Sequence, residues 1–156
     1  MDTDQGMGWY FAYGSNLCVE QMLRRTGPIG EGKDSPCVAR LPGYRLVFNM
    51  QGDDGLVYAN IIQPGDGVIG VLYRCSAAAL ASLDAYEEGY GRRPVLVTLE
   101  GGATREAMAY VARPECTANG GVPSPEYLGI IIRGARRHGL PEAYIRSIEA
   151  QARSSY

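Results

Sequence analysis

Seven short apolar segments, separated by glycine- and proline-rich turns, limit the fold of this 156-residue chain more than any other feature. They lie between residues 9 and 112 and read WYFAY, PCVARL, GYRLVFNM, LVYANIIQ, VIGVLYRC, RPVLVTLE and REAMAYVA. Segments of this length that are bounded by turn residues and rich in β-branched and aromatic side chains predict β-strands. The PGDG sequence joins the fourth segment to the fifth, and GGAT between the last two predicts a hairpin.

The segment LCVEQMLRR after the first strand predicts a short helix. Ser15 or Asn16 is the expected N-cap, because their side-chain oxygens can accept a hydrogen bond from the first turn. The two arginines stand near the C-terminus of this helix, where the helix dipole favours positive charge. Its inward-facing residues are expected to be Leu17, Met22 and Leu23.

Three further helices are expected. SAAALASLDAYEE has Ser76 as its cap, and Ser124 followed by proline begins a helix that closes at Gly139. Pro141 begins the last helix, which runs through about Arg153. Many strands with few helices fit an α+β domain or a small closed barrel better than a doubly wound sheet, and the length fits a single domain over residues 1–156.

Composition excludes several classes of function. The net charge of −2 gives no electrostatic footprint for nucleic acid, and no apolar run approaches the roughly 20 residues that span a bilayer. The acidic N-terminus MDTDQ does not resemble a signal peptide, so we expect a cytoplasmic protein with reduced, buried cysteines. The four cysteines are too widely spaced for a metal site, the single histidine, His138, stands at an expected helix end, and neither nucleotide-binding glycine fingerprint is present. We therefore expect no cofactor and no metal.

The turn in WYFAYGSNL, residues 9–17, is the first candidate site. A strand-to-helix turn that contains Gly14 offers free backbone N–H groups, which can hold an anion. The simpler interpretation is that the turn only connects two elements.

The stretch SLDAYEEGYGRRP is the second candidate, because it places Asp84, Glu87 and Glu88 at the end of a helix, against the helix dipole. If these carboxylates were fully solvated, their unfavourable interaction with the helix dipole would cost little. Partial burial beside Tyr86 and Tyr90 would instead raise a carboxyl pKa and produce a general acid/base that works near neutrality. A single such group, without a Ser, Cys or metal nucleophile, suits an intramolecular reaction in which the substrate carries its own amine.

The chain resembles the γ-glutamylcyclotransferase family, which also includes AIG2-like proteins, over roughly residues 9–150. The resemblance rests on YFAYGSNL, CVARLPGYRL, ANIIQPGDGVIGVLYR, SLDAYE and PSPEYLGIIIRGARRHGLPEAY, which occur in the family's order. It implies an α+β fold, a small mixed β-barrel of about six or seven strands with a few packed helices. It also implies cyclisation of an L-γ-glutamyl group to 5-oxoproline with release of an amine or amino acid, without water or cofactor.

The resemblance also implies the site residues. Glu87, the glutamate of LDxxE, would be the catalytic acid/base. The substrate-binding positions would be Tyr10, Phe11, Ala12, Tyr13, Gly14, Ser15, Asn16 and Leu17 in the first loop, together with Tyr90, Tyr110 and Tyr127. Asp84 is interpreted as structural, and Ser15 has no histidine or lysine partner that would make it a nucleophile.

Several alternatives stay open. The leaving group is an amino acid, an amine or an aminoglycoside antibiotic intermediate, from which the same chemistry would remove a γ-glutamyl protecting group. A barrel that binds a small acidic ligand without turnover, and a γ-glutamyl hydrolase that releases glutamate, are competing classes. The expected partner is a small γ-glutamyl substrate rather than nucleic acid or membrane, and a homodimer is compatible with the sequence.

Overall fold

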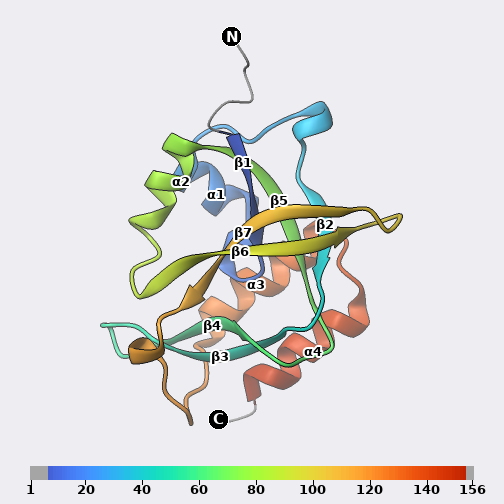
Figure 1. The fold of residues 1–156 in the computed structure, drawn as a ribbon. Helices are drawn as coiled ribbons and strands as arrows, with labels where there is room; N and C mark the ends of the chain where they lie inside the picture. Colours follow the sequence, from blue (N-terminus) through green and yellow to red (C-terminus); the bar gives the residue numbers. More distant parts are fainter. Residues whose placement is uncertain (1–6, 154–156) are drawn as a thin grey trace.

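The structure, a computed structural model, describes residues 7–153. Within that range the chain forms seven strands and four α-helices (Figure 1). The strands are β1 (Met7–Ala12), β2 (Cys37–Leu41), β3 (Arg45–Gln51), β4 (Val57–Ile62), β5 (Val68–Ser76), β6 (Tyr90–Leu99) and β7 (Thr104–Ala112). The helices are α1 (Val19–Thr26), α2 (Ala77–Asp84), α3 (Pro125–Arg137) and α4 (Glu142–Arg153), with 3-10 turns η1 (Ser15–Leu17), η2 (Gly32–Asp34) and η3 (Pro114–Cys116).

Five strands close a barrel in the order β1-β5-β2-β6-β7. The pairs are antiparallel except where β7 returns to β1 in parallel, with Tyr10 opposite Met108. Closure leaves no free sheet edge in the barrel and stacks aromatic side chains inside it. Tyr10 stacks on Tyr73 and meets Tyr110 edge-to-face, at centroid distances of 6.3 and 5.6 Å.

The strands β3 and β4 pair with each other in a two-stranded second sheet, which lies below the barrel in Figure 1 beside α4. The register shifts between Val47 and Met50. The predicted α+β fold with a small barrel is confirmed, but five of the seven strands close the barrel. The PGDG turn consequently carries the chain from one sheet to the other.

Three of the four predicted helices begin where the sequence predicts, but α2 ends at Asp84, four residues before the end of its predicted segment. Ser76 and Ser124 cap α2 and α3 by accepting hydrogen bonds from Ala79 N and Tyr127 N, at 3.0 and 3.1 Å. The last helix begins at Glu142, one residue after Pro141. The hairpin of β6 and β7 also forms as predicted, with β6 starting three residues early, at Tyr90.

The first helix differs from the prediction. The residues Ser15–Leu17 form the separate turn η1, and α1 starts at Val19 with Cys18 as its N-cap and no side-chain cap. Leu23 is 45% exposed rather than inward, because the buried face of the helix carries Gln21 and Met22. The cysteines are free, but only Cys75 is buried and the other three are partly exposed.

Helix α3 holds η1 in place through a glycine. A Cβ atom at Gly134 would lie 2.6 Å from the carbonyl carbon of Leu17 and 2.8 Å from the backbone nitrogen of Cys18. Only glycine allows α3 to approach the turn this closely. No helix within residues 7–153 is both long and apolar enough to cross a membrane.

Candidate active site

The first loop of the chain leaves β1 at Tyr13 and turns sharply through Gly14 into η1. Hydrogen bonds of 3.0 Å from Leu17 N to Gly14 O and from Cys18 N to Ser15 O close the turn. Within the described chain, the backbone N–H groups of Gly14, Ser15 and Asn16 donate to no other protein group. These three donors belong to residues that line one small cavity, which gives the loop the capacity to bind an anion.

Polar side chains hold the backbone of this loop in place through contacts with its carbonyl groups. The hydroxyl of Tyr73 donates to the carbonyl of Asn16 at 2.8 Å. Nε2 of His138 lies 2.9 Å from the carbonyl of Leu17. Burial lowers the pKa of His138 despite that contact, so the ring is neutral and bridges α3 to the loop rather than adding charge to the helix end.

Glu87 enters the same cavity from the turn after α2. Its backbone N–H donates to Asp84 O at 3.1 Å, and its carbonyl accepts from Tyr90 N at 3.1 Å, which fixes the turn. The side chain of Glu87 is only 15% exposed, and burial raises its pKa to about 7, with smaller opposing effects from Arg25 and Asn16. A carboxyl group with this pKa can both accept and release a proton near neutral pH.

The side-chain amide of Asn16 connects the loop to Glu87. Its Nδ2 donates to Glu87 Oε1 at 3.0 Å and to the Tyr10 hydroxyl at 2.9 Å. Its Oδ1 accepts from Gln21 Nε2 at 2.9 Å and from Arg25 at 3.1 Å. Asn16 is 3% exposed with all of these bonds made, so it holds Glu87 in place rather than presenting a free amide to a ligand.

Tyrosine rings form most of the cavity wall, and their hydroxyls are occupied. Tyr13 donates to Tyr110 O at 2.5 Å, and Tyr90 donates to Ala59 O at 2.6 Å. The hydroxyl of Tyr127 accepts from Ala59 N at 3.1 Å. Burial raises the pKa of each of these three phenols, so they remain neutral and shape the cavity.

Asp84 has the structural role expected of it. It accepts hydrogen bonds from Nε and Nη2 of Arg92, at 2.9 and 2.6 Å, and from the Tyr110 hydroxyl at 2.6 Å. Arg92 lowers the pKa of Asp84, which therefore stays ionised. The two nearby carboxyls thus differ in environment, and only Glu87 is poised to exchange protons.

The structure brings together most of the predicted site residues but not all. The cavity is lined by Tyr10, Tyr13, Gly14, Ser15, Asn16, Glu87, Tyr90, Tyr110 and Tyr127, and also by Ala59, which nothing in the sequence indicates. Phe11, Ala12 and Leu17 are fully buried elsewhere. The first two lie against Gly70 of β5, and Leu17 packs on Gly134, so none of the three reaches the cavity.

The aromatic environment of the acids also differs in part from expectation. Tyr90 lines the same cavity as Glu87, but Tyr86 is 55% exposed. The ring of Tyr86 instead lies 4.7 Å from the guanidinium of Arg25, a residue that the sequence suggested only as a charge at a helix end.

The cavity is small, about 30 Å³, which is room for little more than one water. It shares Ser15, Glu87, Tyr90 and Tyr127 with an adjoining groove of about 560 Å³. A ligand can therefore place one reacting bond beside Glu87 while most of its volume occupies the groove.

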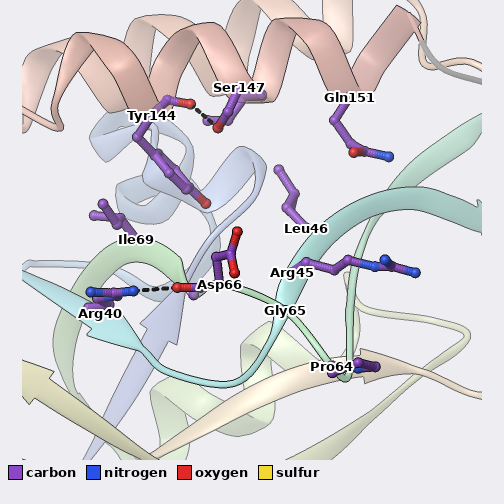
Figure 2. Close-up of a pocket in the computed structure, with 12 residues that line it drawn as sticks. Arg40, Arg45, Leu46, Pro64, Gly65, Asp66, Ile69, Tyr144, Ser147 and Gln151 are labelled. Atoms are coloured by element: carbon purple, nitrogen blue, oxygen red, sulfur yellow. Dashed lines mark hydrogen bonds between the residues drawn. The ribbon is translucent and has the colours of Figure 1, made fainter.

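A different hollow, of about 730 Å³, lies between α4 and the start of β3 (Figure 2). Tyr144 and Ser147 point into it from α4, and Arg40 is bonded to the backbone of Asp66 on its opposite side. It contains none of the predicted site residues. The cavity at Glu87 is therefore the better candidate.

Comparison with known proteins links the chain to one family. Residues 67–148 match the AIG2-like family. The γ-glutamylcyclotransferase of Mus musculus is 34% identical over 94% of this chain and 80% of its own length, and that of Homo sapiens is 36% identical with the same coverage. A solved structure of a γ-glutamyl cyclotransferase superposes with a TM-score of 0.79 at 32% identity, covering 92% of this chain and 87% of its own.

Proposed function

This chain belongs to the γ-glutamylcyclotransferase family and is an enzyme of that kind, and we propose that Glu87 carries out its proton transfers. In this reaction the α-amine of an L-γ-glutamyl group attacks its own γ-carbonyl. The products are 5-oxoproline and a free amine or amino acid. The observation that carries the proposal is that the carboxyl of Glu87 shares one cavity with the unpaired amide donors of residues 14–16.

A single carboxylate can carry out all of the proton transfers in this reaction. Ionised Glu87 takes a proton from the substrate ammonium, and the freed amine forms a bond to the γ-carbon. Protonated Glu87 then gives a proton to the departing nitrogen as the original amide bond breaks. The ring nitrogen loses its second proton to the carboxylate, which passes it to the released amine. Both protons lost by the α-nitrogen thus end on the leaving group, and no water is consumed.

The loop supplies the complementary charge stabilisation. The carbonyl oxygen becomes negative as the ring nitrogen attacks, and the backbone N–H groups of Gly14, Ser15 and Asn16 are fixed donors for it or for the substrate α-carboxylate. Removal of one oxyanion donor costs roughly 3 kcal/mol of transition-state stabilisation in other enzymes. Because the cavity excludes most water, these donors act in a medium where electrostatic interactions are strong.

A covalent acyl-enzyme has little support in this site. The hydroxyl of Ser15 accepts a hydrogen bond of 2.7 Å from Gln21, an amide that cannot act as a base. Among residues 7–153 no cluster of three or more metal-ligating side chains is present that would activate a water molecule instead. The substrate amine is therefore the nucleophile that the site requires.

Product identification tests this function. The full chain is incubated with γ-glutamyl-L-alanine, and 5-oxoproline, free glutamate and alanine are quantified by mass spectrometry. Equal amounts of 5-oxoproline and alanine support the cyclotransferase. Free glutamate would identify a hydrolase, and binding without product would identify a ligand-binding barrel.

A further inference from the structure

Gln21 is a buried amide beside the first loop. It belongs to the first turn of α1, is 8% exposed, and lines the groove but not the small cavity. Its Nε2 carries two N–H donors and both are used, one for Ser15 Oγ at 2.7 Å and the other for Asn16 Oδ1 at 2.9 Å. The amide cannot be turned round, because its own oxygen would then face Asn16 Oδ1, which also accepts from Arg25. Gln21 therefore presents a fixed donor to Ser15.

The hydroxyl of Ser15 keeps a free hydrogen. A serine hydroxyl has one O–H donor and two acceptor lone pairs, and it rotates to suit its partners. The bond from Gln21 occupies a lone pair, and among residues 7–153 the hydroxyl makes no other hydrogen bond. The O–H hydrogen consequently points away from Gln21. Because Ser15 lines both the small cavity and the groove, this hydrogen is available to a ligand there.

We propose that Gln21 is a positioning residue, which orients the Ser15 hydroxyl so that it donates to the γ-carbonyl oxygen of the substrate as that oxygen becomes negative. This inference rests on the proposed function and adds one side-chain donor to the backbone donors of the loop. Gln21 acts through Ser15 and transfers no proton, because an amide is neither an acid nor a base near neutral pH.

The position of Ser15 favours the γ-carbonyl oxygen over the substrate α-carboxylate as the acceptor. Gly14 and Asn16 line only the small cavity, whereas Ser15 lines the cavity and the groove, as Glu87 does. The scissile bond connects the glutamyl group to the leaving group, so it lies where the two spaces meet. A fixed donor at that boundary is close to the oxygen that becomes charged, and it stabilises the transition state more than the ground state.

The contact of Gln21 with Asn16 offers a competing route to the same site. If Gln21 acted through Asn16, its removal would change the pKa of Glu87, because Asn16 donates to that carboxyl. However, Arg25 also donates to Asn16 Oδ1, at 3.1 Å, so the Asn16 amide stays oriented without Gln21. The midpoint of the pH profile therefore separates the routes, since it moves only if Gln21 acts through Asn16.

A double-mutant cycle tests the inference. Gln21→Met keeps the length of the side chain and removes both donors, and Ser15→Ala removes the hydroxyl. We measure kcat and KM for γ-glutamyl-L-alanine by 5-oxoproline release from pH 5 to 8.5, in both single variants and in the double variant. Arg24→Met, an exposed position on the same helix, is the matched control. Thermal unfolding establishes that each variant is folded, and Gln21→Leu replaces Gln21→Met if the latter does not fold.

Ser15→Ala is expected to lower kcat about 100-fold, the effect of one oxyanion donor, and to change KM by less than about threefold. Gln21→Met should lower kcat about 3- to 10-fold, the range for one hydrogen bond, with KM and the midpoint of the pH profile unchanged. The double variant should be no slower than Ser15→Ala, because Gln21 has no effect once the hydroxyl is gone. Arg24→Met keeps the wild-type kcat.

Other outcomes overturn the inference. These are a wild-type kcat in Ser15→Ala or Gln21→Met, or a double variant in which the two losses multiply. A shifted midpoint in Gln21→Met shows that Gln21 acts through Asn16 instead, and a raised KM at unchanged kcat shows that the contact is made equally in the ground state. In each of these cases 5-oxoproline is still released, so the cyclotransferase function stands. Absence of 5-oxoproline from the wild-type reaction contradicts the proposed function itself.

Discussion

The side-chain amide of Asn16 donates a 3.0 Å hydrogen bond to Oε1 of Glu87, although the two residues lie 71 positions apart in the chain. This bond joins the loop after β1 to the turn after α2. The hydrogen bond thereby holds the proposed anion donors of the loop close to the proposed proton carrier, Glu87.

The rate should depend on the ionisation of Glu87. Below its pKa of about 7 the carboxyl is protonated and cannot accept a proton from the substrate ammonium. We expect kcat/KM of the wild type to rise about tenfold per pH unit below neutrality and to level off above it. A pH profile of 5-oxoproline release from pH 5 to 8.5 measures this. A flat profile over this range would contradict the assigned role.

Removal of the Asn16 amide should displace that profile. The hydrogen bond from Asn16 lowers the pKa of Glu87, so Asn16→Leu should move the midpoint to higher pH and reduce kcat/KM at pH 7 by roughly tenfold or more. Tyr10→Phe is the control, because it removes another partner of Asn16 and leaves the bond to Glu87. An unchanged midpoint in Asn16→Leu would show that Asn16 has no effect on Glu87.

Stability should also depend on pH through Glu87. Its pKa is about 7 in the folded protein and 4.5 in the ordinary, solvated state, so the folded state holds this proton more tightly. The contribution is fully present below pH 4.5 and is lost as the pH rises through about 7, by roughly 3 kcal/mol in total.

Glu87→Gln should therefore gain in unfolding free energy relative to the wild type between pH 4.5 and 7.5. Urea unfolding at several pH values measures the difference, with Glu88→Gln as the matched control that keeps the wild-type dependence. A constant difference between Glu87→Gln and the wild type would contradict the burial of Glu87.

The stability and turnover of two glycine variants test the close packing of α3 on η1. Gly134→Ala places a methyl group within 2.8 Å of the backbone at Leu17 and Cys18, so we expect a loss of about 1–3 kcal/mol and reduced turnover. Gly129→Ala on the same helix meets only the flexible end of Arg133, at 3.0 Å, and should gain helix propensity of up to about 1 kcal/mol. Thermal unfolding of both variants, with turnover assays, checks the pair. Equal stability of the two would contradict the packing.

Local patterns in the sequence predict much of this molecule. Ser76 and Ser124 cap their helices because capping depends on a few adjacent residues. The prediction that a carboxyl beside tyrosines would have a raised pKa applies to Glu87, which lines one cavity with Tyr90.

Such local patterns do not predict contacts between residues that are far apart in the chain. Alternation of apolar residues does not specify strand partners, so the separate sheet of β3 and β4 was not foreseen. The contacts of Asn16 with Glu87 and Arg25 depend on how two distant turns meet. Leu17 and Phe11 were assigned to the site with their neighbours, although the close approach of Gly134 and Gly70 places them in the core.

The most direct test of the account is turnover by Glu87→Gln. This variant keeps the shape of the side chain and its capacity to accept the bond from Asn16, and it removes the titratable proton. We predict that 5-oxoproline release falls at least a thousandfold, roughly 4 kcal/mol, while substrate affinity measured by calorimetry stays within a few fold and Glu88→Gln remains active. Glu87→Gln that releases 5-oxoproline at a rate near the wild type would show that another group carries the protons.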